Sequence, residues 1–540
     1  MAAEGDFLIM SGSYIAPEMV AEFGLIPPAF LPFGMARLYE RQVAFARGRG
    51  ARVFITLPDN FKIPEADARW LSAAEVTVLP MSARLSLPAA MKAALAAIEP
   101  TGQLRVLHGD TLVRFEDDAP DEDVFGVGST DHYAVWAEFE PRLNGKTHFR
   151  EGLTSAGQSR SVICGYFAFA DGSAIRRFID EEGATFVGAL SAYAQERRLD
   201  PVLVAQWLDF GHLQTYFQSR QADLASREFN SVVGTRFGIR KTGTPARKIY
   251  SEALWFREAP ADLRPFLPQL YSHSTGDEVA YELEYLFLPS VSELFVFGNL
   301  PLPVWHNILG SCQDALDICH QTRPKAGETP PRYENRFFRD VVVDKTLDRI
   351  ETFSRAREIS LDTDWRCDGH SMPSLRRTVE QLLAAIPPTR GSDICLWHGD
   401  FHFANLLFDF RGRRVRVIDP RGMLSDGSIT MFGDRRYDVS KLTHSVIGLY
   451  DFIVSRRFEI QRNGVYDMNI IFPLDSNLRR IQDMYSSMEF MGIRPSSREV
   501  LALTALLFFS MLPLHSDARD RQDAMLANAF RLARLAEEAV

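Results

Sequence analysis

The amino-acid sequence predicts an α/β protein in which a doubly wound domain with a parallel sheet comes first and a domain of α+β type follows. In the first 110 residues, short apolar runs alternate with stretches of helical periodicity, which is typical of a parallel sheet covered by helices. The chain has 540 residues, enough for about two to four domains. A polar run at residues 218–227 separates these elements from a new pair of strand-like runs. We therefore expect the first domain to occupy residues 1–225.

The first domain is expected to carry its ligand at the carboxyl ends of its strands, as parallel sheets do. A helix is predicted at 37–46, and strands at four apolar runs: 7–10, 52–57, 75–79 and 104–108. A turn containing Gly12 follows the first strand, and Asp110 follows the fourth. Asp209 precedes a glycine and a helical stretch. A lone aspartate in a turn after a strand is common, but two in this setting are candidate metal ligands.

Several of these segments resemble the sugar-phosphate nucleotidyltransferases. The resemblance covers residues 27–42, the Gly-Asp turn at Asp110, the stretch around Asp209 and the strand at 164–169. It implies a Rossmann-like domain in which Asp110 and Asp209 hold the Mg²⁺ that bridges the nucleotide and the sugar phosphate. It also implies that the loop at Gly12 binds a nucleoside triphosphate, with CTP as one candidate.

Two departures from that family leave the activity of the first domain open. The loop after the first strand has one glycine and no arginine, and Pro28 stands where the family has a lysine. Both positions contact the triphosphate in the family. The domain is therefore either an active nucleotidyltransferase, with another basic residue such as Arg37 or Arg41 in their place, or a domain that only binds a sugar or a nucleotide.

The second domain begins with two predicted strands, 228–233 and 236–241, and a helix at 245–256. Lys241 is expected at the end of the second strand and Glu252 within the helix. A strand and hinge are predicted at 281–288. A helical region starts at Trp305 and includes three amphipathic or apolar helices: 374–386, 500–512 and 523–538.

The most informative stretch is the pattern H-G-D-x-H-x-x-N from His398 to Asn405, followed by an apolar strand that ends at Asp419. Phosphoryl transfer requires a carboxylate that orients or deprotonates the attacking hydroxyl, and oxygen ligands that hold Mg²⁺ on the phosphates. Asp400 suits the first role. Asn405 and Asp419 suit the second, because Mg²⁺ prefers carboxylate and amide oxygens.

This stretch resembles the catalytic loop of the aminoglycoside phosphotransferase and choline kinase family, which has a bilobal, protein-kinase-like fold. The resemblance implies that Asp400 is the catalytic base, that His398 braces the loop, and that Asn405 and Asp419 bind Mg²⁺. It implies that Lys241 and Glu252 form the ion pair that positions ATP. The alternatives are a solvated strand end for Lys241 and a surface charge for Glu252. A segment at 432–442 resembles another family motif, in which Asp438 is structural.

Composition limits the other possibilities. The formal net charge is −10, which argues against a general nucleic-acid-binding protein. The five cysteines are scattered without a C-x-x-C pair, which suggests neither a zinc site nor a disulfide framework. We expect no signal peptide, no membrane insertion and a cytoplasmic location. The apolar run 500–512 is too short to span a bilayer.

Together these observations predict a bifunctional enzyme with a kinase-like N-lobe at 226–300 and a helical C-lobe at 301–540. One half would phosphorylate a small hydroxyl-bearing metabolite, a sugar or an amino alcohol, with ATP and Mg²⁺. The other would couple the phosphate to a nucleotide, giving an activated precursor of a surface polysaccharide, as in fused capsular biosynthesis proteins. The alternative is a kinase whose first domain only binds a ligand. The sequence identifies neither the acceptor nor the oligomeric state.

Overall fold

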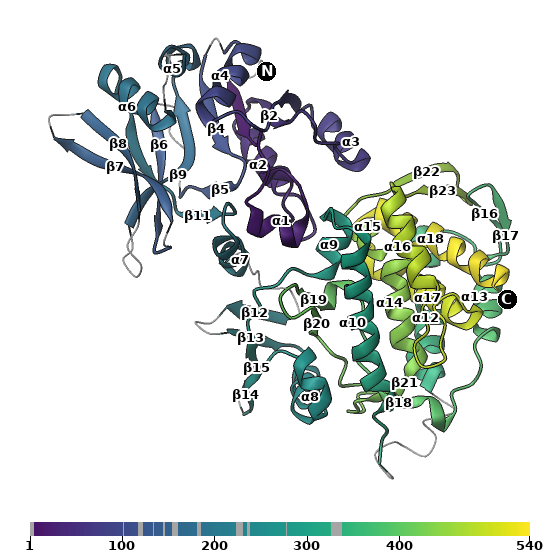
Figure 1. The fold of residues 1–540 in the computed structure, drawn as a ribbon. Helices are drawn as coiled ribbons and strands as arrows, with labels where there is room; N and C mark the ends of the chain where they lie inside the picture. Colours follow the sequence, from purple (N-terminus) through teal and green to yellow (C-terminus); the bar gives the residue numbers. More distant parts are fainter. Residues whose placement is uncertain are drawn as a thin grey trace. The chain divides into compact units, whose positions relative to one another are not determined.

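The computed structural model describes residues 5–100, 102–116, 123–132, 134–143, 146–153, 160–180, 185–222, 230–234, 238–276, 278–325 and 337–539. The chain separates into two compact units, Met1–Asp223 with Phe297–Asn299, and Leu224–Val296 with Leu300–Val540 (Figure 1). The predicted boundary after residue 225 falls outside the described residues, so the exact limits of the predicted domains stay a prediction. The predicted fold class is confirmed, because a doubly wound unit is followed by a two-part α+β unit.

A seven-stranded sheet organises the first unit. Its strands, in spatial order, are β10 (Asp200–Leu203), β6 (Val124–Thr130), β9 (Arg160–Phe169), β4 (Leu104–His108), β1 (Asp6–Met10), β2 (Arg52–Pro58) and β3 (Thr77–Met81). The four predicted strands, β1 to β4, are mutually parallel. Strand β9 runs antiparallel to both of its neighbours, β4 and β6. The central strand β1 is buried along its whole length, as its uninterrupted apolar sequence predicts.

Helices and two short strand pairs complete the first unit. The helices are α1 (Pro17–Phe23), α2 (Leu38–Arg47), α3 (Glu65–Ala73), α4 (Leu87–Ile98), α5 (Gly172–Ile179), α6 (Phe186–Glu196) and α7 (Leu213–Ala222). The strand pairs are β5 (Thr111–Arg114) with β11 (Gln206–Asp209), and β7 (Val135–Leu143) with β8 (Lys146–Leu153). The antiparallel pairing of β5 with β11 places Asp209 opposite Thr111. It therefore brings the second predicted aspartate beside Asp110.

The second unit begins with an antiparallel sheet of four strands, β12 (Asn230–Gly234), β13 (Gly238–Gly243), β15 (Val279–Glu284) and β14 (Leu270–Thr275). Helix α8 (Ala246–Glu258) packs against this sheet. The sequence placed Lys241 at the end of its strand, and this detail was wrong. Strand β13 continues to Gly243, and Lys241 pairs with Val232 on one side and Tyr281 on the other. Lys241 therefore lies inside a central strand of this sheet, and it is buried.

The larger part of the second unit is mainly helical. Its helices are α9 (Val291–Phe297, whose last residue clusters with the first unit), α10 (Leu302–Gln321), α12 (Asp344–Arg357), α13 (Leu375–Ala384), α14 (Arg435–Val446), α15 (Tyr450–Val454), α16 (Ser476–Ser486), α17 (Arg498–Met511) and α18 (Arg519–Glu538). Two antiparallel strand pairs hold residues 398–419 in place, namely β18 (Ile394–Leu396) with β21 (Phe432–Asp434) and the hairpin of β19 (Leu406–Asp409) with β20 (Arg414–Val417).

The sequence had suggested that this lobe is all-helical, and this expectation was wrong. It contains a second four-stranded sheet, β17 (His370–Met372), β16 (Trp365–Cys367), β23 (Asp467–Ile471) and β22 (Glu459–Gly464). Strands β22 and β23 form a hairpin whose turn is Val465 and Tyr466, and the pairing register shifts between Arg462 and Gly464 just before it.

Within the described residues, one segment, Arg498–His515, is long and apolar enough to cross a membrane by length and composition alone. However, 67% of this segment is buried in the protein. Helix α17, which makes up most of it, packs against α14 and α18 (Figure 1). This burial is that of a core helix, which agrees with the expectation for residues 500–512.

Candidate functional site

In the second unit, the structure brings Lys241, Glu252 and Asp419 together. The ammonium nitrogen Nζ of Lys241 donates to Oε2 of Glu252 at 2.7 Å and to Oδ1 of Asp419 at 2.9 Å. The hydroxyl of Tyr281 donates to the same Oε2 atom at 2.8 Å. The side chains of Lys241 and Glu252 are only 6% and 4% exposed, whereas that of Asp419 is 46% exposed. Neither Lys241 nor Glu252 is therefore a solvated surface charge.

The electrostatics of this cluster keep Lys241 charged. Burial alone would lower the pKa of Lys241, but the carboxylates of Asp419 and Glu252 outweigh burial and raise it. Burial raises the pKa of Glu252, and the lysine opposes that effect. The backbone of Asp419 lies in the left-handed region, with φ +57°. A non-glycine residue adopts this conformation only when its surroundings enforce it, and such strain is often found at functional sites.

A second group of side chains surrounds Asp400. Its Oδ1 atom pairs with Nζ of Lys441 at 2.8 Å, and its Oδ2 accepts a hydrogen bond from Nδ2 of Asn405 at 3.2 Å. His402 lies 3.5 Å from the same Oδ2 atom. Burial raises the pKa of the Asp400 carboxyl, but the neighbouring cations, Lys441 foremost, bring it well below its usual range. Asp400 is therefore ionised at neutral pH.

His398 holds the loop in place without being charged. Its Nε2–H donates to the carbonyl of Ile418 at 2.9 Å, and its Nδ1 accepts from the backbone N–H of Asp400 at 3.2 Å. Both contacts require the neutral Nε2–H tautomer, and burial lowers the pKa of His398 to about 4. The imidazole thus connects the loop of Asp400 to the strand end that precedes Asp419.

Asp438 fixes the same loop from the other side. Its carboxylate accepts the backbone N–H groups of His398 at 2.6 Å and of Gly399 at 2.8 Å. Burial raises the pKa of Asp438 to about 7, against the lowering effect of these two donors. The side chain is 1% exposed and lies behind the loop. Its role is structural, as the resemblance implied.

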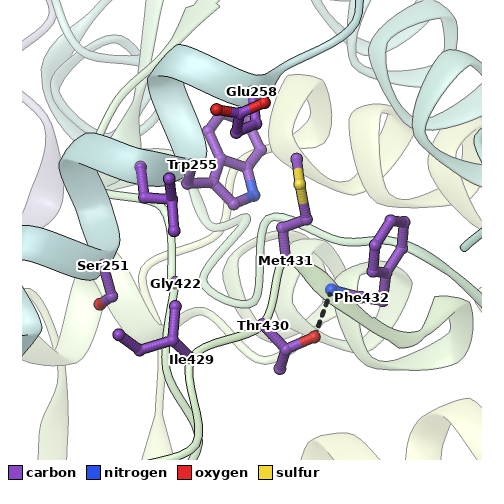
Figure 2. A pocket seen from close by; sticks show the side chains of 9 residues that line it. Ser251, Trp255, Glu258, Gly422, Ile429, Thr430, Met431 and Phe432 are labelled. Atoms are coloured by element: carbon purple, nitrogen blue, oxygen red, sulfur yellow. Dashed lines mark hydrogen bonds between the residues drawn. The ribbon is translucent and has the colours of Figure 1, made fainter. Parts of the chain in front are cut away.

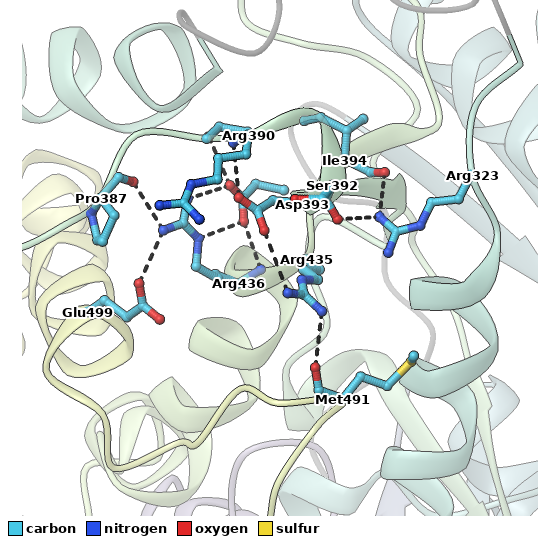
Figure 3. A network of polar contacts seen from close by, with 12 residues as sticks. Arg323, Pro387, Arg390, Ser392, Asp393, Ile394, Arg435, Arg436, Met491 and Glu499 are labelled. Atoms are coloured by element: carbon cyan, nitrogen blue, oxygen red, sulfur yellow. Dashed lines mark hydrogen bonds and ion pairs between the residues drawn. The ribbon is translucent and has the colours of Figure 1, made fainter.

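The start of helix α14, which carries Asp438 and Lys441, is anchored by a network of polar contacts (Figure 3). The guanidinium of Arg436 forms two hydrogen bonds with the carboxylate of Asp434, at 3.0 and 2.7 Å. It also donates to the carbonyl of Pro387 and to Glu499. Asp434 caps the helix by accepting the N–H of Arg436. Asp434 is thus occupied by Arg436. Arg421 lies over the rings of Trp397 and Tyr437.

Helix α8 packs closely against the segment after Asp419. A Cβ atom on Gly422 would lie 2.1 Å from the carbonyl oxygen of Ser251, which directly precedes Glu252. Figure 2 shows Gly422 and Ser251 beside a small pocket that also includes Trp255 and Met431. The glycine therefore permits a close contact with the residue that precedes Glu252.

The oxygen atoms in this site fit a hard cation such as Mg²⁺. Nδ2 of Asn405 donates to the carbonyl and the carboxylate of Asp400, which leaves its Oδ1 as the free acceptor. Lys241 occupies one oxygen of Asp419. Across the described residues, no group of three or more His, Cys, Asp or Glu side chains could hold a metal. A site of one carboxylate and one amide suits Mg²⁺, which takes its remaining ligands from phosphates and water.

The structure also brings Asp110 and Asp209 together in the first unit. A Cβ on Gly211 would lie 2.7 Å from Oδ2 of Asp110 and 3.4 Å from Oδ1 of Asp209, so glycine leaves space between the carboxylates. Burial and the charge of Asp209 raise the pKa of Asp110 to about 6. His212 contacts Asp209 at 3.3 Å, and this hydrogen bond raises the pKa of His212. Two carboxylates that repel each other fit a divalent cation.

Gln42 supports the pair of Asp110 and Asp209, a role that was not predicted from the sequence. Its Nε2 lies within 3.2 Å of three backbone oxygens in the Asp110 turn, those of His108, Gly109 and Thr111. The signal was present, because Gln42 ends the segment that resembles the nucleotidyltransferases. Lys441 likewise lies in the segment 432–442 that resembles a family motif, but only the structure shows its contact with Asp400.

Gly12 lies in the turn after β1. The turn after the neighbouring strand β4, at Gly109, packs against Ser11. A Cβ on Gly12 would be 2.6 Å from the sulfur of Met81, so a larger residue here would have to displace the flexible side chain of Met81. Arg37, one of the substitutes considered for the missing basic residues, is buried and pairs with Asp67 at 3.1 Å. Arg41 is exposed on α2. A nucleotide contact by Gly12 stays a prediction.

Comparison with known proteins gives a family match in the second half of the chain. Residues 247–449 match the phosphotransferase enzyme family. This match covers the catalytic loop, Glu252 and Asp419, and it establishes a phosphotransferase domain in the second half of the chain. A comparison with curated proteins gave no match.

Among solved structures, HddC from Yersinia pseudotuberculosis is 13% identical, and the match covers 40% of this chain and 99% of that one, with a TM-score of 0.30. The inositol-1-phosphate CTP transferase from T. maritima is 10% identical over 40% of this chain and 92% of that one, with a TM-score of 0.31. The Plasmodium vivax ethanolamine kinase is 10% identical over 67% of this chain and 96% of that one, with a TM-score of 0.29.

Proposed function

Because residues 247–449 form a domain of the phosphotransferase enzyme family, we propose that the second half of the chain transfers the γ-phosphoryl group of ATP to the hydroxyl of a small metabolite. The observation that carries this proposal is the convergence of two clusters, Lys241–Glu252–Asp419 and Asp400–Asn405–Lys441. These are the residue types that kinase-like phosphoryl transfer requires.

Each residue has a distinct task in this proposal. Lys241, fixed by Glu252, binds the phosphates of the nucleotide. Asp419 and Asn405 hold Mg²⁺ through oxygen atoms. Asp400 orients the acceptor hydroxyl and receives its proton, while Lys441 faces the same carboxylate. In this chemistry ATP supplies the phosphoryl group and Mg²⁺ neutralises its negative charge.

For the first half we propose nucleotidyl transfer to a sugar phosphate, with Asp110 and Asp209 as the metal ligands and a second nucleoside triphosphate such as CTP. The close approach of the two carboxylates supports this role. The absence of a lysine at position 28 and the burial of Arg37 support the alternative, a domain that binds a ligand without turnover. If both halves are active, the chain makes an activated precursor in the cytoplasm, in line with its resemblance to fused capsular biosynthesis proteins.

The test measures nucleotide binding and ADP release by the full chain in the presence of Mg²⁺. Asp419→Ala should remove the stabilisation of the protein by ATP, and Asp400→Asn should abolish ADP release while ATP still binds. The matched control is Asp364→Asn, because Asp364 is exposed and outside both clusters. Retained turnover in Asp400→Asn would contradict the kinase assignment.

The same experiment separates the two views of the first half. A nucleoside triphosphate other than ATP should stabilise the wild-type protein and lose this effect in Asp110→Ala. If no nucleotide responds to Asp110→Ala, the first half does not bind a nucleotide through this pair, and the nucleotidyl transfer proposal fails.

A further inference from the structure

A cavity of about 210 Å³ adjoins Asp400 in the second unit. Its walls come from α12, the catalytic loop, α14, α15 and α17. Lys241, Glu252, Asn405 and Asp419 do not line it. It therefore reaches Asp400 without contact to these four residues, and an acceptor hydroxyl inside it would lie against Asp400. Its volume is below the range of about 300–1,000 Å³ for drug-sized ligands, so it suits a small metabolite.

The charged side chains that line this cavity are predominantly positive. Lys345, Arg349, Arg421 and Lys441 all face it, and Asp400 is the one acidic side chain in its described lining. The ion pair with Lys441 already offsets the charge of Asp400. His444 also lines the cavity, and burial keeps its pKa well below the usual range, so this ring is neutral. The cavity thus carries a net positive charge.

Two of these cations are not needed for the transferred phosphoryl group. Lys441 and Arg421 flank Asp400 and can serve that group. Lys345 and Arg349, in contrast, project from helix α12, one turn apart. Arg349 donates to the carbonyl of Ser510 at 2.7 Å, and within the described part of the chain neither cation pairs with a carboxylate.

The repulsion between these cations affects the pKa of Lys345. Burial, together with the charges of Arg421, Arg349 and Lys441, lowers its pKa to about 8. Crowded, partly buried cations are costly unless an anion compensates them. A cationic amino alcohol or aminoglycoside would add to this repulsion.

We propose that the acceptor carries a fixed negative charge, a phosphate or a carboxylate, which Lys345 and Arg349 bind while its hydroxyl reaches Asp400. The inference rests on the proposed kinase function and names its substrate class. In the reaction, the acceptor oxygen forms a bond to the γ-phosphorus of ATP, the bond from that phosphorus to the β-phosphate oxygen breaks, and the hydroxyl proton passes to Asp400. The products are ADP and a metabolite with two anionic groups, and Asp400 then releases the proton to solvent.

The first experiment compares acceptors at equal concentration with the full chain and Mg²⁺–ATP. The panel contains sugar phosphates, sugar acids, neutral sugars and amino alcohols, and the readout is ADP release. We expect turnover with one of the two anionic classes, and the responding class distinguishes phosphate from carboxylate. Faster turnover of a neutral or cationic acceptor would overturn the inference and leave the kinase assignment intact.

The second experiment uses variants of α12. Lys345→Met and Arg349→Met should each raise the KM of the anionic acceptor at least tenfold and change the KM of ATP less than twofold. Arg355→Met is the matched control, because Arg355 is an exposed arginine on the same helix that does not line the cavity. An equal effect in all three variants would contradict a specific anion site.

A binding measurement tests the anion site even if none of the acceptors in the panel is phosphorylated. Inorganic phosphate and acetate are titrated calorimetrically into the protein saturated with Mg²⁺–ADP. We expect at least one anion to bind the wild type and Arg355→Met, and to bind the double variant Lys345→Met/Arg349→Met at least tenfold more weakly. Absence of anion binding to the wild type would refute the inference. A protein that binds anions but neither ATP nor ADP would refute the kinase function instead.

Discussion

Replacing Gly422 by alanine tests whether the contact between α8 and the segment after Asp419 sets the geometry of the nucleotide site. The added Cβ would lie 2.1 Å from the carbonyl oxygen of Ser251, whereas ordinary contact begins at 3.4 Å, so the two segments must separate by about 1.3 Å. Glu252 follows Ser251 on the helix, and its bond to Lys241 is 2.7 Å long. A shift of this size would lengthen that bond beyond hydrogen-bonding distance.

The expected cost follows from the geometry. A misplacement of about 1 Å in a catalytic site can reduce the rate by roughly 100-fold, and partial relaxation would leave a loss of about 10- to 100-fold in kcat/KM. This corresponds to about 1.4–2.7 kcal/mol of transition-state stabilisation. If the loop moves instead of the helix, Asp419 shifts relative to Lys241, and the loss is of similar size.

Two assays check this prediction: ADP release with the acceptor that the panel identifies, and calorimetric titration with Mg²⁺–ATP, which needs no acceptor. We expect weaker ATP binding and slower turnover in Gly422→Ala. The matched control is Gly310→Ala in α10, where a Cβ meets nothing within 4 Å. That variant should keep full activity and gain up to about 1 kcal/mol of stability, because alanine favours a helix. ATP affinity and turnover within twofold of wild type in Gly422→Ala would refute the reasoning.

Three further predictions concern charge. Asp110→Asn should stabilise the protein in the absence of Mg²⁺ above pH 6 by at most about 3 kcal/mol, because folding raises the pKa of Asp110 from 3.8 to about 6. The wild-type protein regains this stability as the pH falls from 6 to 4. The thermal melts of variant and wild type should therefore differ at pH 8 and coincide at pH 4. Arg436→Ala should cost about 3–5 kcal/mol in denaturant unfolding, because it leaves a buried carboxylate unpaired, whereas Arg376→Ala, at an exposed pair, should cost less than about 1 kcal/mol. Lys441→Met should raise the pKa of Asp400 and move the acidic limb of the pH–rate profile to higher pH; an unchanged limb would contradict the importance of this ion pair.

Local patterns in the sequence predicted much of the fold and the residues of the site. The four parallel strands of the first unit follow from apolar runs whose period and length are local properties. The residues from His398 to Asp419 follow from spacing on a single loop and hairpin. What the structure adds there is contact, such as the hydrogen bonds from Lys241 to both Glu252 and Asp419.

The features that sequence reasoning missed depend on segments far apart in the chain. Strand β13 extends past Lys241 because Val232 and Tyr281 pair on either side of it. The sheet in the helical lobe forms because β16, near residue 366, meets β23, near residue 467. The positive cavity is built from α12, α14 and the loop after Asp419, and no single stretch shows its charge.

The ion pair between Lys441 and Asp400 has a consequence for the timing of the reaction. The pKa of Asp400 lies well below its usual range, so this carboxylate is a weak base. An alcohol that has not yet begun to react is a far weaker acid than the Asp400 carboxyl group and does not give up its proton to it. The alcohol becomes acidic only after its oxygen has begun to bond to phosphorus. The proton should therefore leave late, after the bond to the leaving group has largely broken, so that Asp400 acts first as a guide for the nucleophile and only afterwards as a base.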